Sequence, residues 1–512
     1  LVTVIGKAED PSNDMKMILN KYDYTQEFSG KVNQTVQSFS QESIVNEIPN
    51  RRDLRDWNSF TIDPVDAKDF DDAISIKQNQ DGYTLGVHIA DVSHFVTPNS
   101  PIDREAIVRA TSVYFTEGVV HMLPEELSAN LCSLRPNLDR LAVSAIIKMD
   151  KNFNVLETEV LPTVINSKAR FTYQDVQDIV NGKTDHFVKN EINMLKHLAK
   201  QLFKNRSDAG SIDFDIPEPI FEMGEKGIPH EIRPSERMES HRIVEECMLL
   251  ANRLVAAEIP KILPKKYPFI YRVHPKPDKL KVERFIDLLK LLHLGIPIPQ
   301  GELSPNDIKN VLKHVEDSPF RSLIETVALR TMSKAEYGMN NAGHFGLAFD
   351  NYTHFTSPIR RYPDLMVHRM IKMVCHNSFE PKSDWHEMME KAIKFSNQAE
   401  LQALSAEREY IKMKQLRWLE ERIGQSFEGI ISGVVNFGFF VGLDLSLAEG
   451  LVHTETLEDD EYSYDQDHYC LRGRKEKREF RLGDRVKVKL LDVLFDKQRA
   501  NFVLDNEEDN SA

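Results

Sequence analysis

Apolar and polar residues alternate on both sides of one acidic stretch. Phe60 and Ile62 alternate with polar neighbours before it, and Ile74 and Ile76 do the same after it. This alternation is typical of short, half-buried β-strands. The stretch between them, residues 63–72, contains five aspartates. The pattern therefore predicts an acidic turn held between two strands.

The rest of the first 375 residues mixes strand and helix periods without the regular alternation of a parallel α/β sheet. The polar segment 32–50 is rich in Ser, Gln and Asn and is expected to be a connector. Strands are predicted over 86–92 and 141–149, and amphipathic helices over 101–110, 239–258 and 279–294. A short helix is also predicted over 125–131. These elements indicate a large mixed domain of the α+β class.

A long helix is predicted to end this domain. Its expected N-cap is Asn397, with Glu400 three residues later, and Gly424 is the expected stop. After Gly424 the pattern changes to short strands separated by turn residues. Five are predicted, over 427–435, 437–441, 450–453, 485–493 and 499–504. Five strands in so short a span are typical of a small OB-type barrel.

The predicted barrel carries aromatic residues beside a basic segment. Phe437, Phe440 and His453 supply aromatic faces, and residues 472–489 contain nine Lys or Arg. Single-stranded nucleic acids bind such surfaces, because bases stack on aromatic rings and phosphates need cations. A barrel core of Phe with a solvated charged loop has the same composition. The residues by themselves leave both interpretations open.

Composition limits the classes to which the chain can belong. Of its 512 residues, 41% are hydrophobic and 28% are charged, which suits a globular protein with a proper core. No apolar run is long enough for a membrane span, so we expect no membrane partner. The four cysteines lie far apart, which indicates neither a zinc site nor a disulfide scaffold and favours the cytoplasm. A net charge of −15 argues against indiscriminate binding of polyanions.

The acidic stretch is the first candidate for chemistry. Its aspartates are Asp63, Asp66, Asp69, Asp71 and Asp72. Carboxylates beside apolar strands repel one another and resist desolvation, so they need a cation or extra protons. A hard dication with oxygen ligands meets that need. A solvated loop is the common alternative, whereas an EF-hand loop is disfavoured because Lys68 stands where that loop needs Gly.

Five long motifs, taken together, resemble one family. They are D-P-V-D-A-K-D-F-D-D at 63–72, H-I-A-D-V-S-H-F-V at 88–96, V-Y-F…M-L-P-E-E-L-S-A-N-L-C-S-L at 113–134, R-I-V-E-E-C-M-L-L-A-N at 242–252 and T-S-P-I-R-R-Y-P-D-L at 356–365. Their order and content closely resemble the catalytic (RNB) domain of the ribonuclease II and ribonuclease R exoribonucleases. The R-R-Y-P-D-L form is most similar to the ribonuclease R branch. Several ordered motifs are far more specific than one acidic cluster.

The resemblance implies a domain organisation. Residues 1–50 are expected to be the remnant of a cold-shock domain with a linker, and 51–423 the RNB catalytic domain. An S1-type OB barrel is expected over 424–504, and a disordered acidic tail over 505–512. The expected activity is processive 3′-to-5′ hydrolysis of single-stranded RNA to nucleoside 5′-monophosphates by a monomer without a nucleotide cofactor. A catalytically silent RNA-binding protein and a deoxyribonuclease are the competing hypotheses.

The resemblance also assigns residues. Asp63, Asp69, Asp71 and Asp72 match the metal-binding acids of the family, which implies two Mg²⁺ ions. Asp71 and Arg360 match the positions most directly tied to catalysis. Among the expected RNA contacts, Tyr114 and Phe214 match the aromatics that stack on bases. The others are Tyr173 and Glu245, which match positions that recognise ribose, and the barrel residues Phe437, Phe440 and His453.

Overall fold

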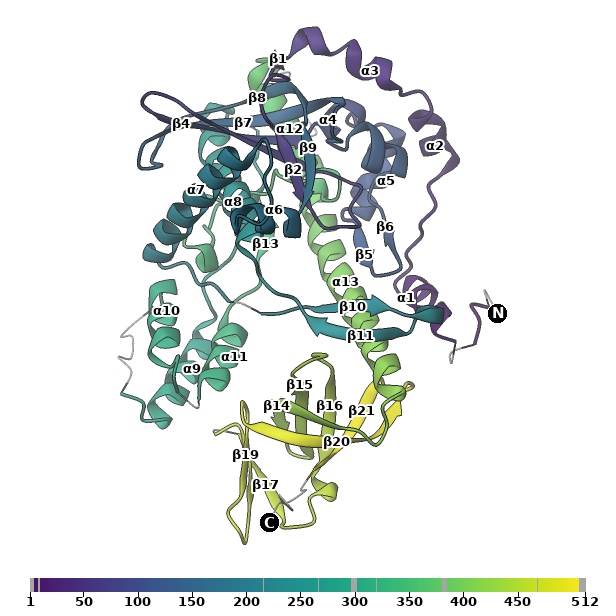
Figure 1. Ribbon diagram of the computed structural model, residues 1–512, viewed down its shortest axis with the longest axis vertical. Helices are drawn as coiled ribbons and strands as arrows, with labels where there is room; N and C mark the ends of the chain where they lie inside the picture. The colour runs from purple at the N-terminus through teal and green to yellow at the C-terminus, as the bar shows by residue number, and fades with distance from the viewer. Residues whose placement is uncertain are drawn as a thin grey trace.

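The computed structural model describes residues 4–7, 10–214, 216–265, 267–295, 302–318, 320–379, 385–466 and 468–505. Figure 1 shows a large body of helices and strands, a small barrel below it, and the long helix α13 (Trp385–Glu420) running between the two. This arrangement confirms the predicted mixed catalytic domain followed by a small barrel. The predicted tail beyond residue 505 lies outside the described residues.

The centre of the large domain is a seven-stranded sheet in the order β1-β8-β7-β4-β3-β2-β9. Its strands are β1 (Arg52–Asp53), β2 (Phe60–Asp63), β3 (Asp72–Gln78), β4 (Gly82–Ala90), β7 (Asp139–Asp150), β8 (Val155–Asn166) and β9 (Ala169–Thr172). The edge pairs β1–β8 and β2–β9 are parallel, and the other pairs are antiparallel. Every residue of β2 is buried, since β2 lies between β3 and β9. The acidic stretch therefore begins and ends inside this sheet.

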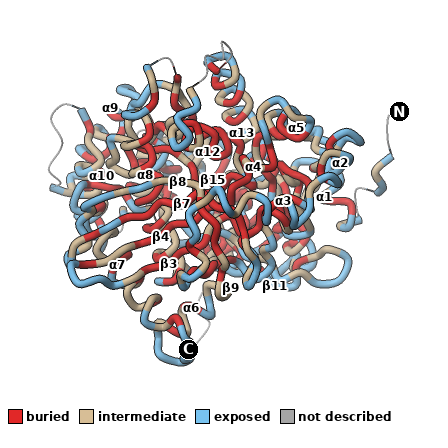
Figure 2. The backbone as a smooth tube through the Cα atoms, turned by 90° about the horizontal axis from the view of Figure 1, so that it is seen from above, coloured by how far each residue is buried: buried red, intermediate tan, exposed pale blue. Residues whose placement is uncertain are grey.

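Helices cover the sheet and supply most of the remaining core. They are α4 (Val92–Phe95), α5 (Pro101–Arg109), α6 (Tyr173–Val180), α7 (Lys189–Asp208), α8 (Glu239–Ile262), α9 (Lys279–Leu291), α10 (Pro305–His314), α11 (Arg321–Thr331) and α12 (Tyr362–Cys375). Helix α12 packs against β8, α7 against β3, and α8 against β4. Figure 2 shows the buried residues gathered around β7, β8 and α12. The amphipathic helices predicted over 101–110, 239–258 and 279–294 are confirmed as α5, α8 and α9.

Short elements complete the large domain. They are β5 (Val113–Phe115), β6 (Gly118–Val120), β10 (Pro219–Met223), β11 (Pro229–Pro234), β12 (Tyr271–Val273), β13 (Glu336–Gly338), and the single-turn helices η1 (Pro11–Asn13), η3 (Glu126–Leu131), η4 (Glu225–Gly227) and η5 (Phe345–Leu347). The helix predicted over 125–131 is η3, which has the wider π-type turn. Strands β5 and β6 form a hairpin in which Tyr114 stands opposite Val119.

The segment predicted to be a connector over 32–50 is helical. It contains part of α2 (Gly30–Val36), all of α3 (Gln41–Val45) and η2 (Ile48–Asn50), after α1 (Asp14–Lys21). The prediction was wrong because a few apolar residues in a polar background suffice to dock short helices. Val32, Val36 and Ile44 are buried in the main core.

Helix α13 begins at Trp385, twelve residues before its predicted N-cap. Asn397 lies inside the helix, where its side chain accepts from the N–H of Tyr337 at 2.8 Å and donates to the carbonyl of Tyr337 at 3.0 Å. These bonds satisfy the backbone N–H and carbonyl of Tyr337 in β13. Asn397 therefore binds the neighbouring strand and does not cap the helix. The buried residues Met389 and Ala392 extend the helical period before it. None of the helices in the described part of the chain has the length and apolar content needed to cross a bilayer.

The barrel is closed in the order β14-β15-β16-β21-β20, as the five predicted strands require. Its strands are β14 (Ser426–Val435), β15 (Gly438–Leu443), β16 (Glu449–His453), β20 (Arg485–Leu494) and β21 (Arg499–Leu504). After β16, the turn η6 (Thr454–Thr456) leads to a small sheet that was not predicted, formed by β17 (Tyr462–Asp465), β18 (Cys470–Gly473) and β19 (Glu479–Arg481). The basic segment lies on and after this sheet. Several of its arginines, including Arg472, Arg478 and Arg485, form ion pairs with nearby acids.

Candidate active site

One pocket of about 1020 Å³ contains most of the predicted site residues. Its walls come from the 63–72 loop, the β5–β6 hairpin, the start of α6 and the turn before α12. The predicted residues that line it are Asp63, Asp69, Asp71, Asp72, Tyr114, Tyr173 and Arg360. Asp66, to which no role was assigned, lines it as well. Residues nearly 300 positions apart in the sequence thus share one cavity.

The sheet explains why the acids meet. Asp63 is the last residue of β2 and Asp72 is the first residue of β3, and these strands are antiparallel neighbours with Phe60 opposite Ile74. The loop between them therefore leaves the sheet and rejoins it at the same end of these two strands. Asp71 stands directly before β3, and Ala90 of β4 donates its N–H to the Asp71 carbonyl at 2.8 Å. That bond fixes the backbone beneath the carboxylate.

Asp71 is the most deeply buried of the four acids, with 4% of its surface exposed. Its Oδ1 accepts from the N–H of Ile359 at 2.9 Å. Its Oδ2 has no hydrogen-bond partner and lies 3.6 Å from Nε of Arg360. Burial raises the pKa of Asp71 well above its usual value, although Arg360 opposes the shift. The carboxylate therefore lacks enough positive charge around it.

The other acids have the same shortage of positive charge. Burial, together with repulsion from Asp72, raises the pKa of Asp63 to about 7. Burial raises the pKa of Asp72 to about 6, against the opposing effect of Arg360 and Arg361. Oδ2 of Asp63, like that of Asp71, is buried without a hydrogen-bond partner. Unsatisfied carboxylate oxygens are what a hard dication needs as ligands, so this donor set fits Mg²⁺.

The four acids are not drawn together around a single point. Across the described ranges, the only three potential ligands within 4.8 Å of one another are Glu222, His230 and Glu231, which are exposed on the β10–β11 hairpin. Carboxylates without a cation between them repel, which keeps them apart. The wider spacing is compatible with ligands shared between two ions.

The two tyrosines occupy different walls of the pocket. Tyr114 donates its hydroxyl to Oδ2 of Asp69 at 2.7 Å and remains 38% exposed. The ring of Tyr173 stacks on His241 of α8, with centroids 4.0 Å apart. Burial raises the pKa of both hydroxyls, so both stay protonated and can donate. Tyr114 thus presents an accessible ring directly beside a predicted metal ligand.

Glu245 and Phe214 do not line this pocket. Glu245 is half-buried and pairs with Arg237 at 2.5 Å and with Arg206 at 3.6 Å. Its neighbour Glu246 is buried and is bound by Arg206 at 2.7 Å, so Glu245 is the more accessible of the two. Phe214 packs against the core formed by α9, α10 and α11. Glu245 lies in α8 itself, and Phe214 lies in the segment between α7 and β10.

The barrel residues form a separate aromatic face. Phe437 is 43% exposed, and its ring stacks with that of His453 at a centroid distance of 6.0 Å. Phe440 is half-buried, whereas Phe439 between them is in the barrel core. The barrel therefore uses alternate aromatic residues for its core and for its surface.

Several pocket residues were not predicted from the sequence. Ser357 accepts from the Arg360 guanidinium at 3.1 Å and so orients it. Ser357 belongs to the quoted 356–365 motif, which was the available signal. Glu117 and His121 also line the pocket. They come from the β5–β6 hairpin and the segment after it, and no spacing pattern marks them.

Comparison with known proteins gives a consistent result. The RNB domain model matches residues 51–377, and the S1 RNA binding domain model matches residues 420–505. The chain is 40% identical to ribonuclease R of Aquifex aeolicus over 511 residues, spanning 98% of this chain and 72% of that protein. It is 36% identical to ribonuclease R of Escherichia coli, spanning 99% of this chain and 64% of that protein.

The solved structures agree with the sequence comparisons. Ribonuclease R of Mycoplasma genitalium, in complex with ribose-methylated single-stranded RNA, superposes with a TM-score of 0.90 at 32% identity, covering 98% of this chain and 79% of that one. The yeast pseudonuclease Ssd1 shares the fold at 20% identity, with a TM-score of 0.72. The pocket, the barrel and these matches lead to one conclusion: the chain belongs to the RNB family of 3′-to-5′ exoribonucleases, with ribonuclease R proteins as its relatives.

Proposed function

We propose that this chain degrades single-stranded RNA processively from the 3′ end and releases nucleoside 5′-monophosphates. The observation that carries the proposal is the single pocket in which four acids, Arg360 and Tyr114 meet. A cluster of acids alone occurs in many kinds of binding site, and so does a single arginine. An arginine and an exposed aromatic ring beside a cluster of poorly compensated carboxylates suit a phosphodiester next to a nucleobase.

Each residue has a role that follows from its contacts. Arg360 lies within reach of a phosphoryl group bound beside Asp71, and its guanidinium neutralises charge that grows on the phosphoryl oxygens. Ser357 orients that guanidinium. The ring of Tyr114 stacks on the 3′-terminal base while its hydroxyl holds Asp69. The N–H of Ile359 keeps Asp71 directed into the pocket.

Asp63, Asp69, Asp71 and Asp72 are the residues that would hold two magnesium ions. When bound, these ions supply a water of lowered pKa as the nucleophile and stabilise the departing 3′ oxygen. Cleavage then breaks the bond between phosphorus and that 3′ oxygen, so the phosphate stays on the 5′ carbon of the released nucleotide.

The remaining predicted contacts extend the RNA site away from the pocket. Tyr173 and Glu245 lie toward α8, where a ribose 2′-hydroxyl can both donate and accept. Phe214 lies in the same direction, and Phe437 and His453 offer a stacking surface on the barrel. The relative from M. genitalium was solved with single-stranded RNA, which supports RNA as the partner here.

We further infer that the chain acts in the cytoplasm as a monomer. All four cysteines are free, and three of them are buried, which suits a reducing compartment. Size-exclusion chromatography with light scattering tests the oligomeric state. A dimer mass would contradict the inference.

Three outcomes of one assay separate the competing functions. Single-stranded RNA and DNA labelled at the 5′ end are incubated with Mg²⁺, with EDTA, and with the Asp71→Asn variant. A Mg²⁺-dependent ladder on RNA that the variant lacks supports the proposal. RNA binding without a ladder indicates a silent RNA-binding protein, and equal degradation of DNA indicates a deoxyribonuclease.

A further inference from the structure

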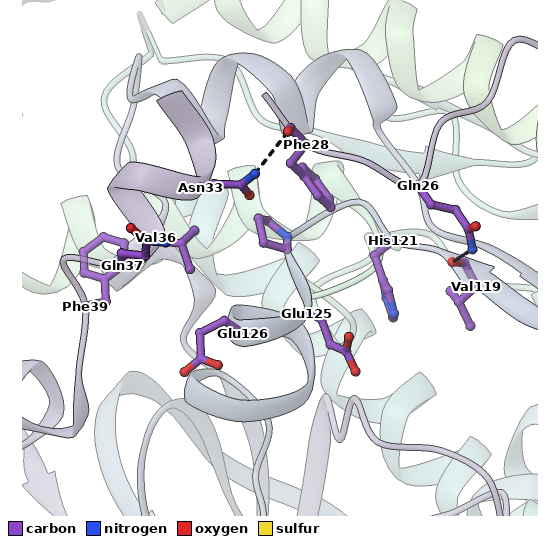
Figure 3. A pocket seen from close by; sticks show the side chains of 11 residues that line it. Gln26, Phe28, Asn33, Val36, Gln37, Phe39, Val119, His121, Glu125 and Glu126 are labelled. Atoms are coloured by element: carbon purple, nitrogen blue, oxygen red, sulfur yellow. Dashed lines mark hydrogen bonds between the residues drawn. The ribbon is translucent and has the colours of Figure 1, made fainter. Parts of the chain in front are cut away.

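A second cavity of about 740 Å³ adjoins the catalytic pocket. The two cavities share Val119, His121 and Glu125 as lining residues. Figure 3 shows the second cavity, with the ring of His121 between the side chains of Glu125 and Val119. Its volume lies within the range of about 300–1,000 Å³ that is typical of small-molecule sites. The catalytic pocket therefore continues into a second chamber that opens to solvent.

The outer wall of this chamber is an N-terminal strap, defined here as residues 23–40. Arg109 of α5 holds the strap by donating to the Thr25 carbonyl at 2.8 Å and to the Glu27 carbonyl at 2.5 Å, and its guanidinium lies 3.9 Å from the ring centre of Phe28. Gln26 donates to the Val119 carbonyl at 3.1 Å. These contacts hold the strap in place, so the cavity has a defined wall on this side. We call it the strap chamber.

The strap chamber lies on the side opposite the proposed RNA path. In both Figure 1 and Figure 2, α8 lies to the left and α2 and α5 lie to the right. Tyr173 and Glu245 belong to the α8 side, so RNA that contacts them approaches from there. Val119 is the cross-strand partner of Tyr114 in the β5–β6 hairpin. Figure 1 shows this hairpin on the same side as α5. A nucleotide cut off beside Tyr114 is therefore next to the strap chamber, while the rest of the RNA blocks the way back.

The charge of the chamber favours release over retention. Among the described residues, its lining includes Glu125 and Glu126, both exposed, and no lysine or arginine. The amides of Gln26, Asn33 and Gln37 add uncharged polar groups to a wall whose other residues are mostly apolar, namely Phe28, Val36, Phe39, Val119 and Pro124. A phosphate dianion that leaves Arg360 for this chamber meets carboxylates, which lowers its affinity.

We propose that the strap chamber is the exit for the released nucleoside 5′-monophosphate, with His121 and Glu125 at the opening between the two cavities. The proposal rests on the function proposed above. His121 is half-buried, and its Nδ1 has no hydrogen-bond partner in the protein. The ring of His121 therefore stands in the shared wall of the two cavities, with one buried nitrogen that no protein group in the described ranges satisfies.

The main test reverses one charge of the chamber wall with Glu126→Arg, because Glu126 lines the strap chamber and not the catalytic pocket. A cation there holds the phosphate dianion, so the inhibition constant of AMP in steady-state RNA degradation falls about tenfold. Single-turnover cleavage, measured with enzyme in excess, stays within about twofold of wild type, because release is not part of that measurement. Glu27→Arg is the matched control, since Glu27 is exposed on the strap but lines neither cavity.

A second variant and a binding measurement complete the test. Gln37→Trp narrows the strap chamber without touching the catalytic pocket, because Gln37 lines only the strap chamber, and steady-state turnover is expected to fall about tenfold with single-turnover cleavage retained. AMP binding is also measured by calorimetry without RNA, where Glu126→Arg is expected to bind AMP about tenfold more tightly than wild type does. Equal AMP affinity in wild type, Glu126→Arg and Glu27→Arg overturns the exit proposal. A single-turnover rate that falls as far as the steady-state rate in Gln37→Trp overturns it as well. If wild type releases no mononucleotide from RNA, the proposed function fails instead, and the calorimetry still decides whether AMP binds in the strap chamber.

Discussion

Arg360 and Asp71 form the most informative pair of single residues. The Arg360 side chain is 44% exposed to the pocket, and its Nε is 3.6 Å from Oδ2 of Asp71. A fully engaged ion pair would be shorter, so the guanidinium retains donors for a substrate. Its position is fixed by Ser357 and not by the acid. This geometry supports the proposal that Arg360 acts on the phosphate during the reaction.

Arg360→Lys is expected to lower kcat by about 10²- to 10³-fold, because a lysine cannot contact two phosphoryl oxygens in the planar manner of a guanidinium. The dissociation constant for a long RNA is expected to change much less, since most contacts lie elsewhere. Steady-state kinetics and filter binding measure the two quantities. Arg104→Lys, at an exposed position of α5, is the control. Loss of binding with unchanged kcat would contradict a role in catalysis.

At the level of elements, α13 contacts three other parts of the molecule through one buried lysine. Lys414 is fully buried and contacts Asp14 at 3.2 Å, Glu117 at 2.7 Å and the Gly227 carbonyl at 2.9 Å. These partners belong to α1, the β5–β6 turn and η4. Since Glu117 also lines the catalytic pocket, the network ties the N-terminal segment to the hairpin that carries Tyr114.

Lys414→Met is expected to destabilise the fold by about 3–5 kcal/mol, because it removes one of the two cations, Lys414 and Arg417, that compensate the buried Asp14. Urea unfolding followed by circular dichroism measures the change. Lys16→Met is the control, since Lys16 is exposed on α1, and it should stay within about 0.5 kcal/mol of wild type. Equal stability of both variants would mean that the network contributes no net stabilisation.

The barrel surface supports a second prediction at this scale. Phe437→Ala is expected to weaken the binding of single-stranded RNA by about 1–3 kcal/mol, the usual worth of one base stacked on an aromatic ring. The measurement is a Kd at fixed salt in the Asp71→Asn background. Leu445→Ala is the control, because Leu445 is exposed at the opposite end of the β15–β16 hairpin. A similar loss in both variants would rule out stacking on Phe437.

For the whole molecule, the acids couple metal binding, pH and stability. The pKa values of Asp63 and Asp72 are raised in the folded state, to about 7 and about 6. The ion-free fold therefore binds protons more tightly than the unfolded chain. The stability that these two acids contribute is fully present below about pH 4 and is lost as the pH rises through about 6 and about 7.

Mg²⁺ should remove this loss of stability at high pH, because the ion takes the place of the protons bound to Asp63 and Asp72. The gain in Tm on adding Mg²⁺ is expected to be clearly larger at pH 8 than at pH 5, as measured by scanning calorimetry. The control is NaCl at the same ionic strength, which should give little gain at either pH. A Mg²⁺ effect that is independent of pH would show that the ions bind away from these carboxylates.

The sequence by itself determined the elements and the identity of most chemical groups. Local periods predicted the helices α5, α8 and α9 and the strands of the barrel, because side-chain periodicity is a property of consecutive residues. The sequence-based prediction was wrong for the segment around Val32, where a few buried apolar residues dock helices in a polar stretch. It was also wrong for Asn397, which binds the backbone of β13 instead of capping a helix. Ordered motifs supplied the four acids, Tyr114, Tyr173 and Arg360.

Only the tertiary structure decided which of these groups act together. It placed Arg360 beside Asp71, left Phe214 and Glu245 outside the pocket, and neutralised much of the basic segment of the barrel with nearby acids. It also formed the strap chamber from the N-terminal strap and the β5–β6 region. Distances between elements depend on the packing of residues far apart in the chain, and no local pattern records that packing.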